Sequence, residues 1–244
     1  MTDHSHCLTL NELDRDGAIR EAGAQVDGAT RAVFLRRTAA FVGGGLLVGT
    51  FPVAFAQAAS GGLPAGDVAI LNYALTLEYL EAAFYAEAVS KGALTGETKT
   101  FAKVVADHEA QHVAALSKAL GSKAVKKPTF NFQGTTSSQS SFQTTAMTLE
   151  DTGVKAYLGQ AGNIKTPAVL QAAGSILPVE ARHAAWIENI ISKGSGSPSP
   201  APDAFQPAAT MTDVLAAVKS TGFITNMATA APGSATPGQP SLTG

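Results

Sequence analysis

Two short segments of this sequence carry the residue types and spacing of a metal-binding helix. Glu109 and His112 are three residues apart, and so are Glu180 and His183. Residues three apart on an α-helix share a face, so both side chains of each pair can reach one ion. Carboxylate oxygen and imidazole nitrogen are common ligands of divalent transition metals. The two segments therefore predict two metal-binding helices.

The two pairs belong to a weak internal repeat. Glu78 is followed seven residues later by Tyr85, and Glu150 is followed seven residues later by Tyr157. Each of these elements in the second half lies 71 or 72 residues after its partner in the first half. The repeat predicts one pair of helices used twice, with metal ligands at Glu78, Glu109, His112, Glu150, Glu180 and His183.

This ligand set has the charge that a pair of metal ions requires. Four carboxylates and two neutral imidazoles carry four negative charges, which offset two divalent cations. Without the cations, the carboxylates would repel one another and lose their hydration inside a protein core. The single glutamates, Glu78 and Glu150, could bridge or cap the two ions. An oxygen-rich shell suits iron or manganese, and we favour two iron ions, although zinc or copper could compete.

Several neighbouring residues have roles that the sequence leaves open. Glu81 lies one helical turn from Glu78 and is an alternate ligand. Tyr85 and Tyr157 could donate hydrogen bonds to the carboxylates or handle electrons, or they could be ordinary core tyrosines. Pro178 precedes Glu180 by two residues and predicts a kink or a lost backbone hydrogen bond there, which could displace Glu180.

A rival motif overlaps the first pair. His108-Glu109-Ala110-Gln111-His112 fits the H-E-x-x-H pattern of zinc metalloproteases, with Glu109 as the general base. That interpretation needs a third zinc ligand and leaves the second Glu-x-x-His pair and the two tyrosines unexplained. We therefore rank it below the two-metal site, and in the two-metal interpretation the role of His108 stays open.

The elements that must position these residues are helices. Apolar residues recur at helical spacing over four long stretches, and a shorter helix is expected over 211–220. Gly92 and Gly121 follow the first two stretches, and Thr166-Pro167 is a suitable start for the fourth. The fold class is therefore all-α, a four-helix bundle with a long crossover at 121–141 between the second and third helices, and the four helices cover 66–91, 97–120, 142–160 and 167–192.

Both ends of the chain differ from this middle part. Arg36-Arg37 precedes an uncharged run, Thr38 to Ala56, that ends in small residues. This is the pattern of a secretory signal, and the arginines around Phe34-Leu35 resemble a twin-arginine signal, although Ala32 replaces the second arginine. The expected organisation is an export leader and signal over 1–56, the bundle over 63–193, a linker and short helix over 194–227, and a disordered tail over 228–244. An uncleaved membrane anchor is the alternative interpretation of the apolar run.

Composition limits the classes of function. Of the 244 residues, 45% are hydrophobic and the formal net charge is −2, which gives no support for nucleic-acid binding. The only cysteine, Cys7, lies in the expected leader. After cleavage the protein would have no thiolate ligand and no membrane segment, so any metal must be held by carboxylate and imidazole.

The repeated motifs resemble the ferritin-like superfamily of di-iron and di-manganese proteins. The segments LEYLEAAFY (77–85) and VEARHAAWI (179–187) are similar to exported bacterial ferritin-like domain proteins of the desiccation-related type. The resemblance covers roughly residues 63–225, and it implies a bundle in which two helices each give a Glu and two each give Glu-x-x-His.

The resemblance also implies a range of functions. The first is a periplasmic or other extracytoplasmic stress-protection enzyme that oxidises ferrous iron with O2 or peroxide, or that removes peroxide. The alternative is a metal-binding or structural stress protein without turnover. Metal ions and O2 or peroxide are the expected partners, and the sequence does not predict an oligomeric state.

Overall fold

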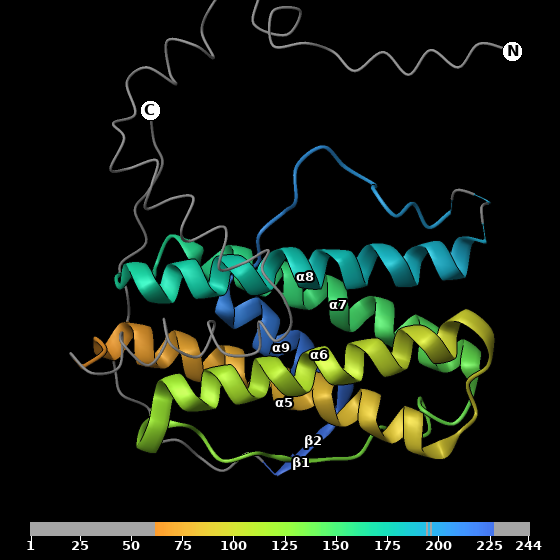
Figure 1. Ribbon diagram of the computed structural model, residues 1–244, viewed down its shortest axis with the longest axis horizontal. Coiled ribbons are helices and arrows are strands. Elements are labelled where there is room, and N and C mark those ends of the chain that lie inside the picture. Colours follow the sequence, from red (N-terminus) through yellow and green to blue (C-terminus); the bar gives the residue numbers. More distant parts are fainter. Residues whose placement is uncertain (1–61, 194, 196, 227–244) are drawn as a thin grey trace, which may run out of the picture. The chain divides into compact units, whose positions relative to one another are not determined.

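A computed structural model describes residues 62–226 of the chain, apart from residues 194 and 196. The expected leader and signal over 1–56 and the expected tail over 228–244 lie outside these residues. The described part is almost entirely helical (Figure 1) and contains helices α5 (Ala65–Lys91), α6 (Gly96–Leu120), α7 (Gln139–Ala161), α8 (Pro167–Ser192) and α9 (Met211–Thr221). The prediction of an all-α bundle with a long crossover is confirmed.

The ends of the helices follow from local sequence. Gly92 ends α5 in the left-handed conformation, with φ of 70°, which glycine adopts without steric cost. The hydroxyl of Ser138 accepts a hydrogen bond from the backbone N–H of Ser141 and so caps α7. The buried carboxylate of Asp67 accepts hydrogen bonds from the N–H groups of Lys165 and Thr166 at 2.9 and 2.8 Å. Asp67 thereby ties the first turn of α5 to the start of α8.

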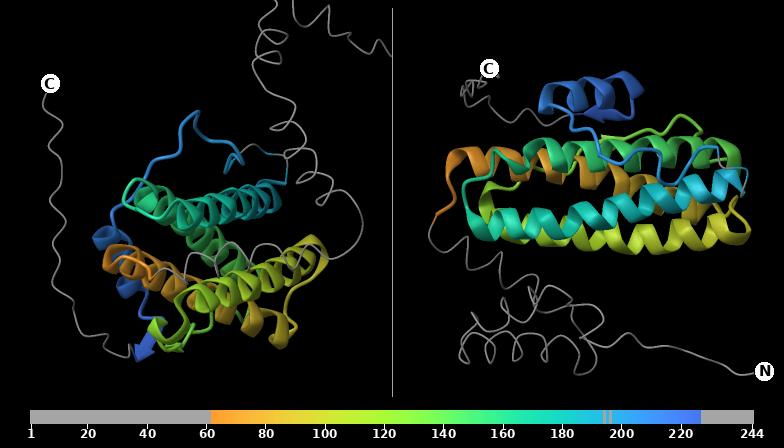
Figure 2. Two further views of the ribbon diagram at one scale, coloured as in Figure 1. Left: turned by 60° about the vertical axis from the view of Figure 1, so that its left-hand side comes forward. Right: turned by 90° about the horizontal axis from the view of Figure 1, so that it is seen from above.

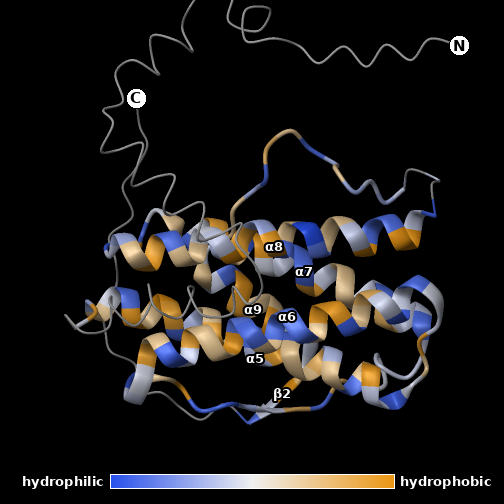
Figure 3. Cartoon of the chain, in the orientation of Figure 1, coloured by the Kyte–Doolittle hydropathy of each residue, from blue (hydrophilic) through white to orange (hydrophobic). Residues whose placement is uncertain are grey.

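The four long helices run side by side (Figure 2), with α5 packed chiefly on α6 and α7 chiefly on α8. Hydrophobic residues recur along each of them (Figure 3) and form two clusters of buried side chains. One cluster surrounds Phe84, Phe101 and Phe142, and the other surrounds Leu75 and Ile176. On α6 and α8 the predicted metal ligands lie between residues of the two clusters.

Pro178 does not interrupt α8, which runs from Pro167 to Ser192. Glu180 is fully buried in the bundle, two residues after this proline. Pro178 and Gly174 are both exposed. The carbonyl group that loses its hydrogen bond to proline thus lies on the outer face of the helix, where water can satisfy it.

Two short strands, which the sequence did not predict, join the crossover to the C-terminal segment. Strand β1 (Thr129–Phe130) pairs antiparallel with β2 (Ile224–Asn226). Helix α9 lies along the outside of the bundle (Figure 2, right) and packs Val214 and Val218 into the cluster around Phe84. No helix among the described residues is long and apolar enough to cross a membrane.

The approach of α9 to the bundle depends on one glycine of α7. The N–H of Ala209 donates to the carbonyl oxygen of Lys155 at 3.1 Å, and a Cβ atom on Gly159 would lie 1.9 Å from the carbonyl oxygen of Ala209. We expect Gly159→Ala to lower the free energy of unfolding by about 1–3 kcal/mol, because backbone must move to admit the methyl group. Urea denaturation measures this change.

Gly162→Ala is the matched control for this prediction. Gly162 has φ of −71°, and a Cβ atom there would meet no atom within 4 Å. Alanine at this position should be neutral or stabilise the protein by up to about 1 kcal/mol. Equal stability of the two variants would show that the contact between Gly159 and Ala209 does not hold α9 in place.

Candidate metal centre

The six predicted ligands come together in the middle of the bundle. Side-chain atoms close enough to share an ion form two groups that each take residues from several helices. The first group is Glu78, Glu109, His112 and Glu180, and the second is Glu109, Glu150, Glu180 and His183. Glu109 and Glu180 belong to both groups, so the two candidate metal positions share these two carboxylates. The shared carboxylates therefore come from the Glu-x-x-His pairs, whereas Glu78 and Glu150 each serve one position.

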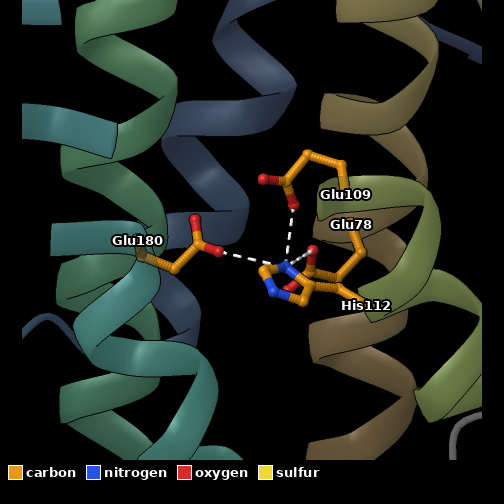
Figure 4. A group of neighbouring side chains, drawn as sticks. All are labelled: Glu78, Glu109, His112 and Glu180. Carbon is orange, nitrogen blue, oxygen red and sulfur yellow. Dashed lines mark hydrogen bonds and ion pairs between the residues drawn. The ribbon is translucent and has the colours of Figure 1, made fainter. Parts of the chain in front are cut away.

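Nδ1 of His112 faces three carboxylates of the cluster, and Nδ1 of His183 faces two. Nδ1 of His112 lies 3.2 Å from Glu78, 3.0 Å from Glu109 and 3.2 Å from Glu180 (Figure 4). Nδ1 of His183 lies 3.2 Å from both Glu109 and Glu150. An imidazole nitrogen that faces carboxylate oxygens in this way is arranged to share a cation with them.

The shared glutamates supply the test of whether metal ions fit. Within the described residues, both side-chain oxygens of Glu180 and Oε1 of Glu109 are buried and accept no hydrogen bond, although Oε1 of each glutamate lies 3.2 Å from a histidine Nδ1 atom. Buried carboxylate oxygens without a hydrogen-bond donor are strongly unfavourable. Cations between the two groups would satisfy these oxygens, so the donor set fits a pair of divalent ions.

Burial and crowding set the protonation of the cluster when no cation neutralises it. Burial raises the pKa of Glu180 well above its usual range, and the Glu109 and Glu78 charges raise it further. Burial and the Glu78 charge likewise raise the pKa of Glu109. Burial also works to raise the pKa of Glu78, but the charge and hydrogen bond of His112 outweigh it and leave that pKa lowered. The cluster therefore holds protons that a metal ion must displace.

His112 carries one of these protons. Burial works to lower the pKa of His112, but the Glu78 charge and the neighbouring carboxylates raise it overall. The protonated Nδ1 atom then lies where the cation would be shared. Metal binding at the first group consequently releases a proton from His112 and is favoured as the pH rises.

Each of the two tyrosines donates a hydrogen bond to a glutamate in the other half of the repeat. The hydroxyl of Tyr85 on α5 donates to Glu150 on α7, and the hydroxyl of Tyr157 on α7 donates to Glu78 on α5. Each tyrosine therefore fixes the glutamate of the other helix rather than the one seven residues before it. Such hydrogen bonds orient a carboxylate for its ion.

Glu81 is buried but lies in neither group of candidate ligands. Burial raises its pKa well above the usual range, and the Glu180 charge raises it further. A Cβ atom on Gly153, which occupies the repeat position equivalent to Glu81, would lie 3.0 Å from Oε2 of Glu180 and 3.4 Å from Oε1 of Glu81. Because Gly153 has no side chain, the carboxyl groups of Glu180 and Glu81 can occupy this space.

His108 contacts the site in a way that the sequence did not reveal. Its Nδ1 atom lies 2.8 Å from Nε2 of His183, and the two rings stack with centroids 5.1 Å apart. Burial and the neighbouring His183 lower the pKa of His108, so neutral His108 can accept the proton of Nε2 and leave Nδ1 of His183 free to bind metal. In the described part of the chain His108 joins no ligand group with His112, which disfavours the zinc-protease interpretation.

Removing the hydrogen-bond acceptor Nδ1 of His108 should weaken metal binding at only one of the two positions. We expect His108→Phe, which keeps a stacked ring, to lower the affinity of the position that contains His183 by about 10–100-fold. His108→Asn, which keeps a hydrogen-bond acceptor near the position of Nδ1, should lower this metal affinity much less. Stepwise calorimetric titration with Mn(II) separates the two positions, and equal weakening of both steps would contradict this assignment.

Comparison with known proteins agrees with this arrangement. Residues 66–193, which contain all four long helices from the first turn of α5 to the end of α8, match the family described as ferritin-like domain. A search of curated proteins found no relative of the chain.

Proposed function

Because the chain belongs to the ferritin-like domain family, we propose that it binds two divalent metal ions, iron in preference to manganese, and uses them in a redox reaction. The observation that carries the proposal is the sharing of Glu109 and Glu180 between two ligand groups, together with their buried oxygens that accept no hydrogen bond. Two ferrous ions bound by these residues would supply two electrons to O2 or peroxide. Ferrous iron oxidation or peroxide removal is the activity that this chemistry supports.

The surrounding residues suit a redox site. Glu78 and Glu150 are held by tyrosine hydroxyls from the opposite helices, which fixes one carboxylate at each metal position. Leu77 and Leu80 on α5 and Leu149 on α7 are buried beside the ligands. These apolar side chains limit the access of water and so limit side reactions of a reactive centre.

Metal content and turnover test the proposal together. Protein purified from iron-supplemented cells should contain about two iron ions per chain, and added Fe(II) should be oxidised rapidly in a stopped-flow experiment with O2 or peroxide. Protein loaded with Zn(II), which is redox-inert, is the control. Two bound ions without turnover would contradict the redox function and support the alternative, a metal-binding stress protein. A single zinc ion that stays bound after Glu180 and His183 are replaced would contradict the two-metal site.

We also propose that the protein is exported and acts outside the cytoplasm. The support is the sequence of residues 30–56, with basic residues before an apolar run and small residues at its end. Replacing Arg31, Arg36 and Arg37 by lysine should retain the protein in the cytoplasm if the twin-arginine route carries it. Cell fractionation and the N-terminal sequence of the mature protein measure the outcome.

A further inference from the structure

The two halves of the repeat differ in how they pack around their tyrosines. Tyr85 is enclosed by a cluster of buried rings, with centroids 5.3 Å from Phe84, 5.8 Å from Phe101 and 5.7 Å from Phe142. Phe84 and Phe142 also stack on each other at 5.2 Å. This side of the metal centre is filled by aromatic side chains.

The equivalent positions on the other side carry smaller side chains. The residue 72 positions after Phe84 is Ala156, the residue 71 positions after Phe101 is Ala172, and the residue 72 positions before Phe142 is Ile70. All three are buried, yet none has a ring. Tyr157 therefore lacks the aromatic enclosure that surrounds Tyr85.

A cavity of about 20 Å³ lies on this less filled side. Its wall includes Ile70, Tyr73, Ala74, Leu77, Ala156 and Tyr157. One water molecule needs about 10–15 Å³ of such space, so the cavity has room for a diatomic molecule. Because the hydroxyl of Tyr157 donates to Glu78, an occupant of the cavity is separated from a predicted metal ligand by one side chain.

The polarity of the side chains that line the cavity determines which kind of molecule can bind there. Most of the lining residues are aliphatic, and the hydroxyl of Tyr157 is already engaged with Glu78. The other polar side chains of the wall are Tyr73, whose hydroxyl is buried without a hydrogen-bond partner among the described residues, and Gln160, whose Oε1 already accepts a hydrogen bond from Asn163 at 3.2 Å. A buried water usually makes about three hydrogen bonds, and hydrogen peroxide likewise has two donors and several acceptor sites to satisfy. An apolar gas has no such requirement.

We propose that this cavity is a binding site for O2, which it holds beside the metal centre on the Tyr157 side. The inference rests on the proposed two-metal function and deepens it, because it selects O2 over peroxide as the oxidant. The aromatic cluster around Tyr85 fills the equivalent space on the other side of the centre.

Dissolved O2 itself is the probe for the first test. O2 is paramagnetic and broadens the NMR signals of methyl groups that it contacts. In the full chain loaded with redox-inert Zn(II), we expect O2 pressure to broaden the methyl signals of Ala74 and Ala156 several-fold more than those of Ala88 and Val105, which are buried but do not line the cavity. Equal broadening on the two sides would overturn the proposal. The same difference in broadening is expected for metal-free protein near pH 5, so the test does not depend on metal binding.

Filling the cavity tests its role in the reaction. Ala74→Leu, or the smaller change Ala156→Val if the first variant unfolds, should abolish the O2-dependent broadening of the remaining cavity methyl. Either variant should also raise several-fold the O2 concentration that gives half of the maximal rate of Fe(II) oxidation. Ala86→Leu places the same side chain at an exposed position of α5 and should behave as the unaltered protein.

Metal titration separates the two proposals. A wild-type chain that fails to bind two ions contradicts the two-metal function, whatever the O2 measurement shows. A chain that binds two ions, and whose cavity-filling variants keep the same dependence on O2, contradicts the cavity proposal alone. A change in the dependence on hydrogen peroxide with none for O2 would contradict it as well.

Discussion

Replacing Glu180 by glutamine is expected to abolish binding of both metal ions at micromolar concentrations. Glu180 belongs to both ligand groups, and glutamine keeps its shape but removes the negative charge that the two positions share. Loss of an outer hydrogen-bond partner typically lowers metal affinity about 10–100-fold, and a shared direct ligand should lower it further at both positions. Calorimetric titration with Mn(II) gives the number of ions and their affinities.

Glu78→Gln is the matched comparison, because Glu78 belongs to the first group alone. This variant should keep one ion, at the position that contains His183, and lose the other. If Glu180→Gln and Glu78→Gln instead lose the same single ion, the two positions do not share Glu180. The assignment of shared and single carboxylates would then be wrong.

The stability of the metal-free variant separates a lost ligand from a lost fold. Burial and the charges of Glu109 and Glu78 disfavour ionisation of Glu180, and the Glu180 charge in turn disfavours ionisation of Glu81. Neutral glutamine removes this repulsion. Metal-free Glu180→Gln should therefore unfold at a temperature equal to or higher than that of the metal-free wild type, although it no longer binds metal.

The sequence predicted the helices because their positions depend on local patterns. Apolar spacing and end signals such as Gly92, Gly121 and Thr166-Pro167 act within a few residues. The repeat then identified the six candidate ligands, because a ligand pair on one helix face has a fixed spacing of three. Fold class and the membership of the cluster were accordingly accessible before the structure was known.

Features that depend on contacts between helices were not accessible in this way. The sequence does not show that Glu109 and Glu180 lie between the two positions, because sharing depends on the rotation of α6 and α8 about their axes. It also does not show which carboxylate each tyrosine contacts, because Tyr157 donates across the bundle to Glu78. Nor does the sequence show that Pro178 lies on the exposed face of α8, where water can satisfy the carbonyl group that loses its hydrogen bond.

Positions at which the two halves of the repeat differ were the signal that could have revealed the contact of His108 and the cavity. His108 corresponds to Val179 in the second half, and the aromatic residues Phe84 and Phe101 correspond to alanines. In the structure His108 contacts His183, and a cavity lies beside Ala156. In a protein built from two similar halves, the positions that differ indicate where the two sides of the centre have different tasks.

Removing the metal ions is expected to reverse the pH dependence of stability that carboxylates normally produce. Glu81, Glu109 and Glu180 have pKa values raised by burial and by one another in the folded chain. Their stabilising contribution is fully present below about pH 4.5, the ordinary pKa of glutamate, and is lost as the pH rises toward the folded values. The raised pKa of His112 acts in the same direction above about pH 6.5. The lowered pKa values of Glu78 and His108 act in the opposite direction, as do those of Asp67 and Glu87, whose effect is complete above about pH 4.5.

The metal-free protein should therefore become less stable between about pH 5 and pH 8. The metal-loaded protein should become more stable over the same range, because cations bind the deprotonated ligands. Each ion present at about one hundred times its dissociation constant adds about 2.7 kcal/mol. Two ions should then raise the unfolding temperature by about 10–20 °C near neutral pH, at about 2–4 °C per kcal/mol for a domain of this size.

Thermal unfolding with a chelator and with Mn(II), followed by circular dichroism from pH 5 to pH 8, measures both trends. The gap between the two curves should widen as the pH rises, and metal-free Glu180→Gln should show a smaller decline than the metal-free wild type. A metal-free protein whose stability increases steadily from pH 5 to pH 8 would mean that the buried glutamates are ionised and paired within the protein. The fold would then satisfy its carboxylates without cations, and the physical reason for placing two metal ions between Glu109 and Glu180 would be gone.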